Sequence, residues 1–355
     1  MIMMNILLAS VGWSLILWTL LDAFEQVILP RTESHVFRIS SLIRRYTWEP
    51  WKALARQITS VERRAAFLSF YGPFSVLILL ASWDFSLILG FSLGWWAARE
   101  GSFANRFYVS GSNFFALGLS SPPVTDIARL TTLVEAGLGL GILAVIIGYL
   151  PVYYGAYSAR EAFIIRFQSM AGSPCTALEV WRHFAPLDRG MRLQLLMDFQ
   201  SWAAHVLQSQ RSYSLVALYR SQKGNESWLA VLTVILDSCA LWIAVPQDRP
   251  RHGPKATFDV ALRAVTELAG AFKLEPKSPP MDRLPRADFQ KLFQALVDTG
   301  MEVVDDPEKA ERNLAELRGI YEPYIYILSE FLYVELPSWM NTEDKTYSSV
   351  EVRAM

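Results

Sequence analysis

Three long apolar runs stand out from the mixed pattern of polar and apolar positions along the chain. They cover residues 6–29, a stretch within 65–98, and residues 130–157. A helix needs about 20 mostly apolar residues to cross the hydrocarbon core of a bilayer. The pattern therefore predicts three transmembrane helices.

The second run is longer than one simple span, and Asp84 interrupts it. Two arrangements fit this length. A tilted helix from about residue 66 to residue 88 could be followed by an external aromatic segment, 90–98, or one helix could extend well beyond the bilayer. The pattern alone leaves both open.

From Ser158 onward, apolar residues recur at the spacing of amphipathic helices, with little strand character. The predicted helices are 177–184, 189–219, 227–245, 257–272, 287–299 and 306–336. The third of these is nearly long enough for a fourth span, but Asp237 lies at its centre. A central Asp costs about 2.5–3.5 kcal/mol on insertion scales. We therefore expect residues 227–245 to be a buried core helix of a soluble domain.

The predicted fold class is all-α, an integral membrane protein with an all-helical cytoplasmic domain. The predicted parts are a transmembrane helix at 1–30, a basic cytoplasmic segment at 31–64, two membrane helices joined by a loop at 65–158, a helical cytoplasmic domain at 159–246, Pro-rich linkers with one helix at 247–285, a helical pair at 286–336, and a tail at 337–355. The tail is polar, and we expect it to be loosely held.

Basic residues set the predicted orientation. The segment between the first two runs carries Arg31, Arg38, Arg44, Arg45, Lys52, Arg56, Arg63 and Arg64. Between the second and third runs lie only Arg99 and Arg106. By the positive-inside rule the first segment is cytoplasmic and the second external. The N-terminus is then outside, the residues after the third run are cytoplasmic, and the expected location is the cell (inner) membrane.

The basic segment 31–64 allows two interpretations. It could be an amphipathic helix on the inner leaflet, with Trp48 and Trp51 at the headgroups and its charges on anionic lipid. It could instead be a helical connector packed on the soluble domain. Both remain open at this stage.

Composition narrows the possible partners and chemistry. The net charge is −1, which gives no basic surface for nucleic acid. The two cysteines and four histidines show no metal-ligand spacing. Nucleotide-binding and nucleophile-elbow motifs are missing from the sequence. We expect no enzyme, no cofactor and no bound metal.

The segment before the third run has an unusual order. An aromatic and Ser-rich stretch, 107–115, precedes a turn centred on Gly118 and then a pair of prolines. Irregular backbone survives at membrane depth only where it is buried or lines a water-filled path. The order therefore points to ion conduction, although a turn that only packs the third helix would also fit.

The residues that follow carry a family resemblance. Pro123-Val124-Thr125, followed by Ala128-Arg129, matches the P-V-T-x-x-G-R stretch of potassium channels, with Ala in place of Gly. Residues 65–161 thus resemble the two-helix pore module of the potassium channel superfamily, including its two-pore-domain branch. The resemblance implies a re-entrant pore loop, a homotetramer in which four loops build one filter, and potassium or another monovalent cation as the permeant ion.

The residues that match the family's filter are Ala116, Leu117, Gly118, Leu119, Ser120 and Ser121. In the family, backbone carbonyls and a Thr hydroxyl replace the water shell of the ion. Here Ala116 lacks that hydroxyl, Leu119 replaces a Tyr, and Ser120 replaces the second glycine. The distance from Gly118 to Pro123 is also one residue short. These departures leave three possibilities: a weakly selective cation pore, a poorly conducting one, or a non-conducting pore fold that anchors or senses for the cytoplasmic domain.

The third run contains two gating candidates. Gly139 lies where the family has its inner-helix hinge, and it is either a hinge or merely a small residue. Pro151 either bends the helix at an intracellular gate or ends the span. Gly137 and Gly141 form a GxxxG pair that Gly148 continues, which is typical of close helix packing in lipid.

Glu135 is an ionisable residue within the third run, and such residues usually face protein or water. It could support the pore by hydrogen bonding to Ser110, Ser112 or Asn113. It could attract cations to a cavity. It could also pair with Arg129 in a structural role.

Overall fold

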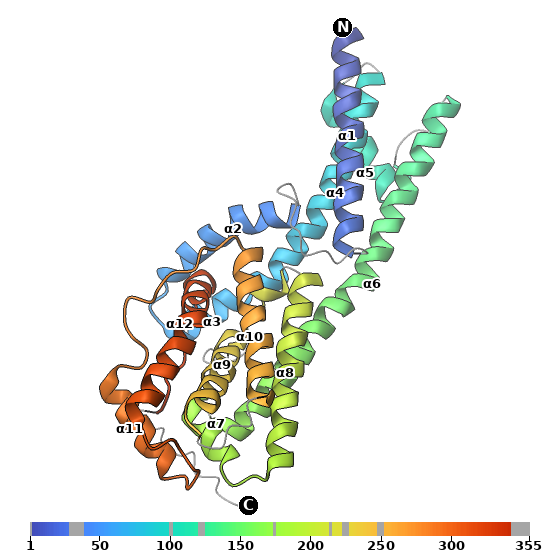
Figure 1. Ribbon diagram of the computed structural model, residues 1–355. Coiled ribbons are helices and arrows are strands. Elements are labelled where there is room, and N and C mark those ends of the chain that lie inside the picture. Colours follow the sequence, from blue (N-terminus) through green and yellow to red (C-terminus); the bar gives the residue numbers. More distant parts are fainter. Residues whose placement is uncertain are drawn as a thin grey trace, which may run out of the picture. The chain divides into compact units, whose positions relative to one another are not determined.

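The computed structural model describes residues 2–27, 39–98, 102–119, 125–172, 175–212, 215–221, 227–246 and 252–341. These residues are helical or irregular, and no strand occurs among them apart from one isolated bridge between Pro246 and Val303. The helices are α1 (Ile2–Val27), α2 (Ile39–Arg56), α3 (Val61–Ser69), α4 (Tyr71–Ala98), α5 (Phe103–Phe114), α6 (Asp126–Ala171), α7 (Ala177–Phe184), α8 (Arg189–Ser212), η1 (Val216–Leu218), α9 (Trp228–Ala244), α10 (His252–Ala271), α11 (Arg286–Val297) and α12 (Pro307–Leu332) (Figure 1).

The chain divides into two compact units. Unit 1 comprises residues 1–159 and 208–220, and unit 2 comprises residues 160–207 and 221–355. Helix α6 is continuous and contributes to both, because its residues up to Ala159 belong to unit 1 and those from Arg160 belong to unit 2.

Three helices are long and apolar enough to cross a membrane, within Met3–Val27, Val61–Ala97 and Asp126–Ala171. They agree with the three runs predicted from the sequence and with a multi-pass membrane protein. Of the two arrangements for the second run, the structure has the single long helix, because α4 continues without a break through Gly90. The short helix α3 precedes it.

Helices α1 and α4 lie side by side in unit 1 (Figure 1). Their closest approach is at two glycines. A Cβ on Gly12 would lie 2.5 Å from the carbonyl oxygen of Gly90, and a Cβ on Gly90 would lie 2.9 Å from that of Gly12. The missing side chains let the two backbones touch, which is how small residues bring apolar helices together in lipid.

The last turns of α1 join three other helices. Asp22 is buried and accepts hydrogen bonds from the indole Nε1 of Trp83 in α4, at 2.8 Å, and from the backbone N–H of Ile39 in α2, at 3.1 Å. One turn later, the carbonyl oxygen of Gln26 accepts from the hydroxyl of Tyr149 in α6, at 3.2 Å. A buried carboxylate is stable only when such donors satisfy it, so Asp22 makes the positions of α2 and α4 depend on each other.

Helix α2 packs its aromatic side inward. Trp48 is buried, with its ring centroid 4.7 Å from that of Tyr71, and Trp51 stacks on Phe67 at 4.6 Å. The interpretation that places both rings at lipid headgroups is therefore wrong for Trp48, because its buried ring packs on Tyr71 of α4. Within unit 1, α2 therefore packs on α3 and α4, and its first residue is bonded to α1.

Unit 2 is built around α9. Nearly all of its residues are buried, including Asp237, and α10 and α12 pack on it. The prediction of a core helix rather than a fourth span is confirmed. The prediction of a loosely held tail is wrong at Trp339, which is 1% exposed, and residues 342–355 of that tail lie outside the described residues. Helices α8 and α12 end earlier than predicted, α8 at Ser212 and α12 at Leu332.

Candidate functional site

The segment that resembles a pore loop begins with α5, which packs on α4 (Figure 1). Ser102 caps its N-terminus, because its side chain accepts a hydrogen bond from the N–H of Asn105. The irregular backbone then runs from Phe115 to Leu119, and we call these five residues the α5–α6 loop. Of the six predicted ion-path residues, Ser120 and Ser121 lie outside the described residues.

The backbone N–H groups of the α5–α6 loop turn back toward α5. Phe115 donates to Gly111 O (3.0 Å), Ala116 to Asn113 O (2.9 Å) and Leu117 to Ser112 O (2.8 Å). The N–H of Leu119 donates to the hydroxyl of Ser112 at 3.0 Å. Ser112 therefore holds the loop at two points.

The carbonyl groups of the same loop accept no hydrogen bond from any residue that the structure describes. Residues 115–119 are exposed in the single chain. Their carbonyl oxygens are therefore open to water, an ion or a second chain.

The backbone angles explain why the N–H groups gather on one side. Ala116 has φ 53° and Gly118 has φ 69°, whereas Leu117 and Leu119 do not have positive φ. Alternating left- and right-handed residues turn successive N–H groups toward one concave side. Glycine takes such a φ at no steric cost, while an L-residue such as Ala116 pays about 1–2 kcal/mol. The hydrogen bonds to α5 hold Ala116 in this conformation.

Glu135 lies behind α5. Its side chain is fully buried and accepts hydrogen bonds from three donors, the Ser110 hydroxyl, Asn113 Nδ2 at 3.1 Å and Trp95 Nε1 at 3.2 Å. The three donors come from α4 and α5, so one carboxylate on α6 joins three helices. Hydrogen bonds to an ionised acceptor are roughly twice as strong as neutral ones.

This geometry tests two of the three interpretations of Glu135, pore support and the ion pair with Arg129. The side chain contacts Ser110 and Asn113, as the pore-support interpretation requires, but not Ser112, which holds the loop instead. The structural ion pair with Arg129 is wrong, because that guanidinium is exposed and pairs with Asp126 at 3.3 Å.

Gly139 lies one turn further along α6, against the end of α5. A Cβ placed there would lie 1.9 Å from the carbonyl oxygen of Phe114. Gly137, Gly141 and Gly148, which the sequence assigned to packing, have nothing within 4 Å of their Cβ positions. Within one chain the close contact therefore belongs to Gly139 and not to the GxxxG pair.

Pro151 lies inside α6, which continues for 20 residues beyond it to Ala171. Pro151 therefore lies within the helix and does not end it. A broad apolar side of α6 is exposed in the single chain, including Ile127, Leu130, Leu133, Leu140, Leu143, Ile147 and Leu150. Such a surface requires lipid or other protein chains around it.

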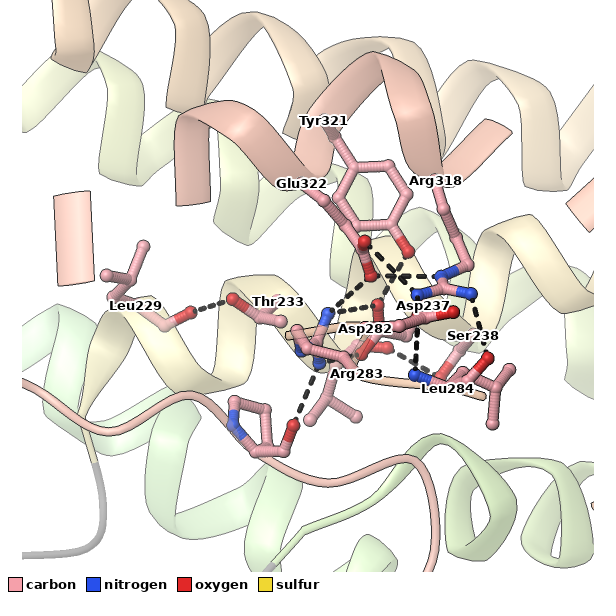
Figure 2. Close-up of polar contacts among 12 residues, drawn as sticks. Leu229, Thr233, Asp237, Ser238, Asp282, Arg283, Leu284, Arg318, Tyr321 and Glu322 are labelled. Atoms are coloured by element: carbon pink, nitrogen blue, oxygen red, sulfur yellow. Dashed lines mark hydrogen bonds and ion pairs between the residues drawn. The ribbon is translucent and has the colours of Figure 1, made fainter. Parts of the chain in front are cut away.

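Unit 2 contains a buried cluster of charges that the sequence analysis did not foresee (Figure 2). Asp237 of α9 pairs with Arg283 at 2.7 Å and accepts from the hydroxyl of Tyr321 at 2.6 Å. Glu322 of α12 pairs with Arg283 at 3.2 Å and with Arg318 at 3.0 Å. The one available signal was Asp237 inside an apolar helix, which indicates that a buried cation must lie opposite.

The charges of this cluster neutralise one another. Burial raises the pKa of Glu322, against the hydrogen bonds from Arg318. Burial also opposes the charge of Arg283, but Asp237 outweighs this and raises the pKa of that guanidinium. Within the described residues no group of three or more His, Cys, Asp or Glu could hold a metal ion. The cluster links α9, α12 and the connection around residue 283.

Comparison with known protein families found no matching family model, and comparisons with curated proteins and with solved structures found no significant match. The likeness to potassium channels therefore rests on the residues named in the sequence analysis.

Proposed function

We propose that the chain is one subunit of a homotetrameric membrane channel for monovalent cations, potassium or a similar ion, with residues 116–121 lining the ion path. The observation that carries the proposal is the α5–α6 loop. Its N–H groups are bound to α5 and Ser112, and the carbonyls of residues 116–119 accept from no described residue. Backbone carbonyls held in this way are the groups that replace the hydration shell of a cation.

Two contacts of α6 support the loop in this proposal. Glu135 binds Ser110 and Asn113, and Gly139 lies against Phe114. The loop would then keep its shape without the Tyr and Thr that potassium channels use. Strict potassium selectivity is not part of the proposal, because Ala116 supplies no hydroxyl ligand and Leu119 supplies no ring hydroxyl.

The proposed arrangement places the N-terminus outside and unit 2 in the cytoplasm of a cell (inner) membrane. The exposed arginines of α2 and α3, Arg45, Arg56 and Arg63, would face anionic lipid. Pro151 stays a gating candidate. In this proposal Gly139 is a packing contact for the end of α5 and not a hinge, because bending at Gly139 would break its contact with Phe114.

Current recordings test the proposal. We expect the purified chain, shown to be tetrameric, to carry monovalent cation current in a planar bilayer. Gly118→Val should abolish the current and leave the tetramer intact, since an L-residue is strained at φ 69°. Gly300→Val is the matched control, because Gly300 also has positive φ (77°) and open space but lies in unit 2. Current that survives in Gly118→Val with unchanged selectivity would exclude this loop as the ion path.

A verified tetramer that carries no current would contradict the channel. The rival function would then stand, a non-conducting anchor or sensor for the helical domain.

A further inference from the structure

The chain reverses direction after α12. Tyr333 has φ 56°, and the N–H of Val334 donates to Ser329 O at 3.0 Å, which closes the end of the helix. Residues 333–341 then run back along unit 2, and we call them the C-terminal strap. Trp339 is the one residue of the strap that is buried.

Trp339 is held by two cations of the charge cluster. The guanidinium of Arg283 lies 5.7 Å from its ring centroid and that of Arg318 lies 5.5 Å away. Both distances are within cation–π range. Arg283 also donates from Nη2 to the carbonyl of Pro337 at 2.8 Å. Figure 2 shows these two arginines with the acids that position them.

The strap also holds the first turn of α7. The carbonyl oxygen of Trp339 accepts from the N–H of Leu178 at 3.2 Å. The next orphan amide of that turn, on Glu179, is capped by the side chain of Thr176 at 3.3 Å. Helix α7 follows α6 after only five residues. The C-terminal strap is thus bonded to the first turn of α7, the helix that follows α6 in the sequence.

The seat of Trp339 is incompletely satisfied. Trp339 Nε1 and Arg283 Nε are buried, and neither has a hydrogen-bond partner among the described residues. Buried donors without acceptors raise the free energy of the seated state. When the strap leaves, both groups regain water. Burial of the Trp339 ring therefore favours the bound strap, whereas the two unsatisfied donors favour its release.

We propose that the C-terminal strap is a releasable latch on α7, with Trp339 as its key residue. The seated strap fixes the first turn of α7 and with it the cytoplasmic continuation of α6. The released strap frees that turn while α9, α10 and α12 remain folded. The consequence for ion flow through α6 rests on the proposed channel function, but the opening itself does not.

Native-state hydrogen exchange on the full-length wild-type chain tests the opening. We expect the strap and the first turn of α7 to exchange together, at least tenfold faster than the core of α9, at denaturant concentrations that leave α9 protected. Exchange of both segments only together with α9 would overturn the latch, because the strap would then be an ordinary part of the core.

A pair of variants isolates the ring. Trp339→Ala should increase exchange at Leu178 at least tenfold and leave α9 protected. Trp339→Phe is the control, because it keeps an aromatic face for both arginines, although it removes the five-membered part of the indole together with the unpartnered Nε1. Exchange at Leu178 in Trp339→Phe should therefore stay closer to the wild type than in Trp339→Ala. Equal exchange at Leu178 in both variants would contradict the assigned role of the ring.

Current recordings on the same proteins test the link to α6. If the wild type conducts, Trp339→Ala should change its open probability at least twofold and Trp339→Phe should not. Opening of the latch with unchanged current would overturn the link to α6. A wild type that carries no current would count against the channel alone, since the exchange experiment still decides the latch.

Discussion

Gly139 of α6 lies directly against the carbonyl oxygen of Phe114, the last residue of α5, with 1.9 Å between that oxygen and the place where a Cβ would be. No side chain fits at this position without moving α5. Because the α5–α6 loop directly follows α5 and is hydrogen-bonded to it, this contact links the position of α6 to the shape of the loop.

A methyl group at Gly139 tests the contact. We expect Gly139→Ala to lower the stability of unit 1 by about 1–3 kcal/mol, the usual cost of overpacking, measured as a drop in the thermal midpoint in detergent. Gly141→Ala is the control, since nothing lies within 4 Å of its Cβ position. Equal midpoints for the two variants would mean that α5 does not rest on Gly139.

The hydrogen bonds that the Glu135 carboxylate accepts should contribute more to the stability of unit 1 than the volume of its side chain does. Glu135→Leu leaves the donors of Ser110, Asn113 and Trp95 without an acceptor, and each unmet buried donor costs about 1–3 kcal/mol. We expect Glu135→Gln to be milder, because its amide oxygen still accepts. Thermal midpoints of the two variants check this order. Asp126→Asn should leave the midpoint unchanged, because Asp126 is exposed.

The acid stability of unit 2 should depend on Asp282. Burial raises the pKa of Asp282, but hydrogen bonds from Arg318 and from the N–H of Leu284 outweigh it, so the net pKa lies below 3.8. Its contribution to stability is therefore complete above pH 3.8, the pKa of the unfolded chain, and is lost as the pH falls through the lower folded value.

Asp282→Asn should remove that loss, so that the unfolding free energy of the variant falls less below pH 3.8. Glu322 has the opposite sign, because its pKa is raised above 4.5. Its ionisation opposes folding as the pH rises above 4.5. Denaturant unfolding followed by circular dichroism at several pH values measures both slopes. Parallel curves for the wild type and Asp282→Asn would refute the assignment.

The two cysteines report topology and folding. Cys175 is half-buried, whereas Cys239 is fully buried in α9, where burial raises the pKa of its thiol. We expect an impermeant thiol reagent to label Cys175 from the cytoplasmic side only. Cys239 should react only after unit 2 unfolds, since the thiolate is the reactive form. Cys175→Ser removes the native label, and labelling of Cys175 from outside would reverse the orientation.

Element positions followed closely from local patterns. The three spans, the helices of unit 2 and the burial of α9 were predictable, because length, apolar period and the cost of Asp237 in lipid are properties of one segment. The sequence left three possible roles for Glu135, because its hydrogen-bond partners Trp95 and Asn113 lie on other helices.

The sequence by itself determined that this protein has three apolar helices, a glycine-centred turn before the third and a helical remainder, because burial of apolar surface sets these features locally. Only the tertiary structure decided that Gly139 and not Gly141 contacts Phe114, that Trp48 is buried, and that the ring of Trp339 lies against two arginines. Each of these depends on which backbone lies opposite, and no period within one segment specifies that neighbour.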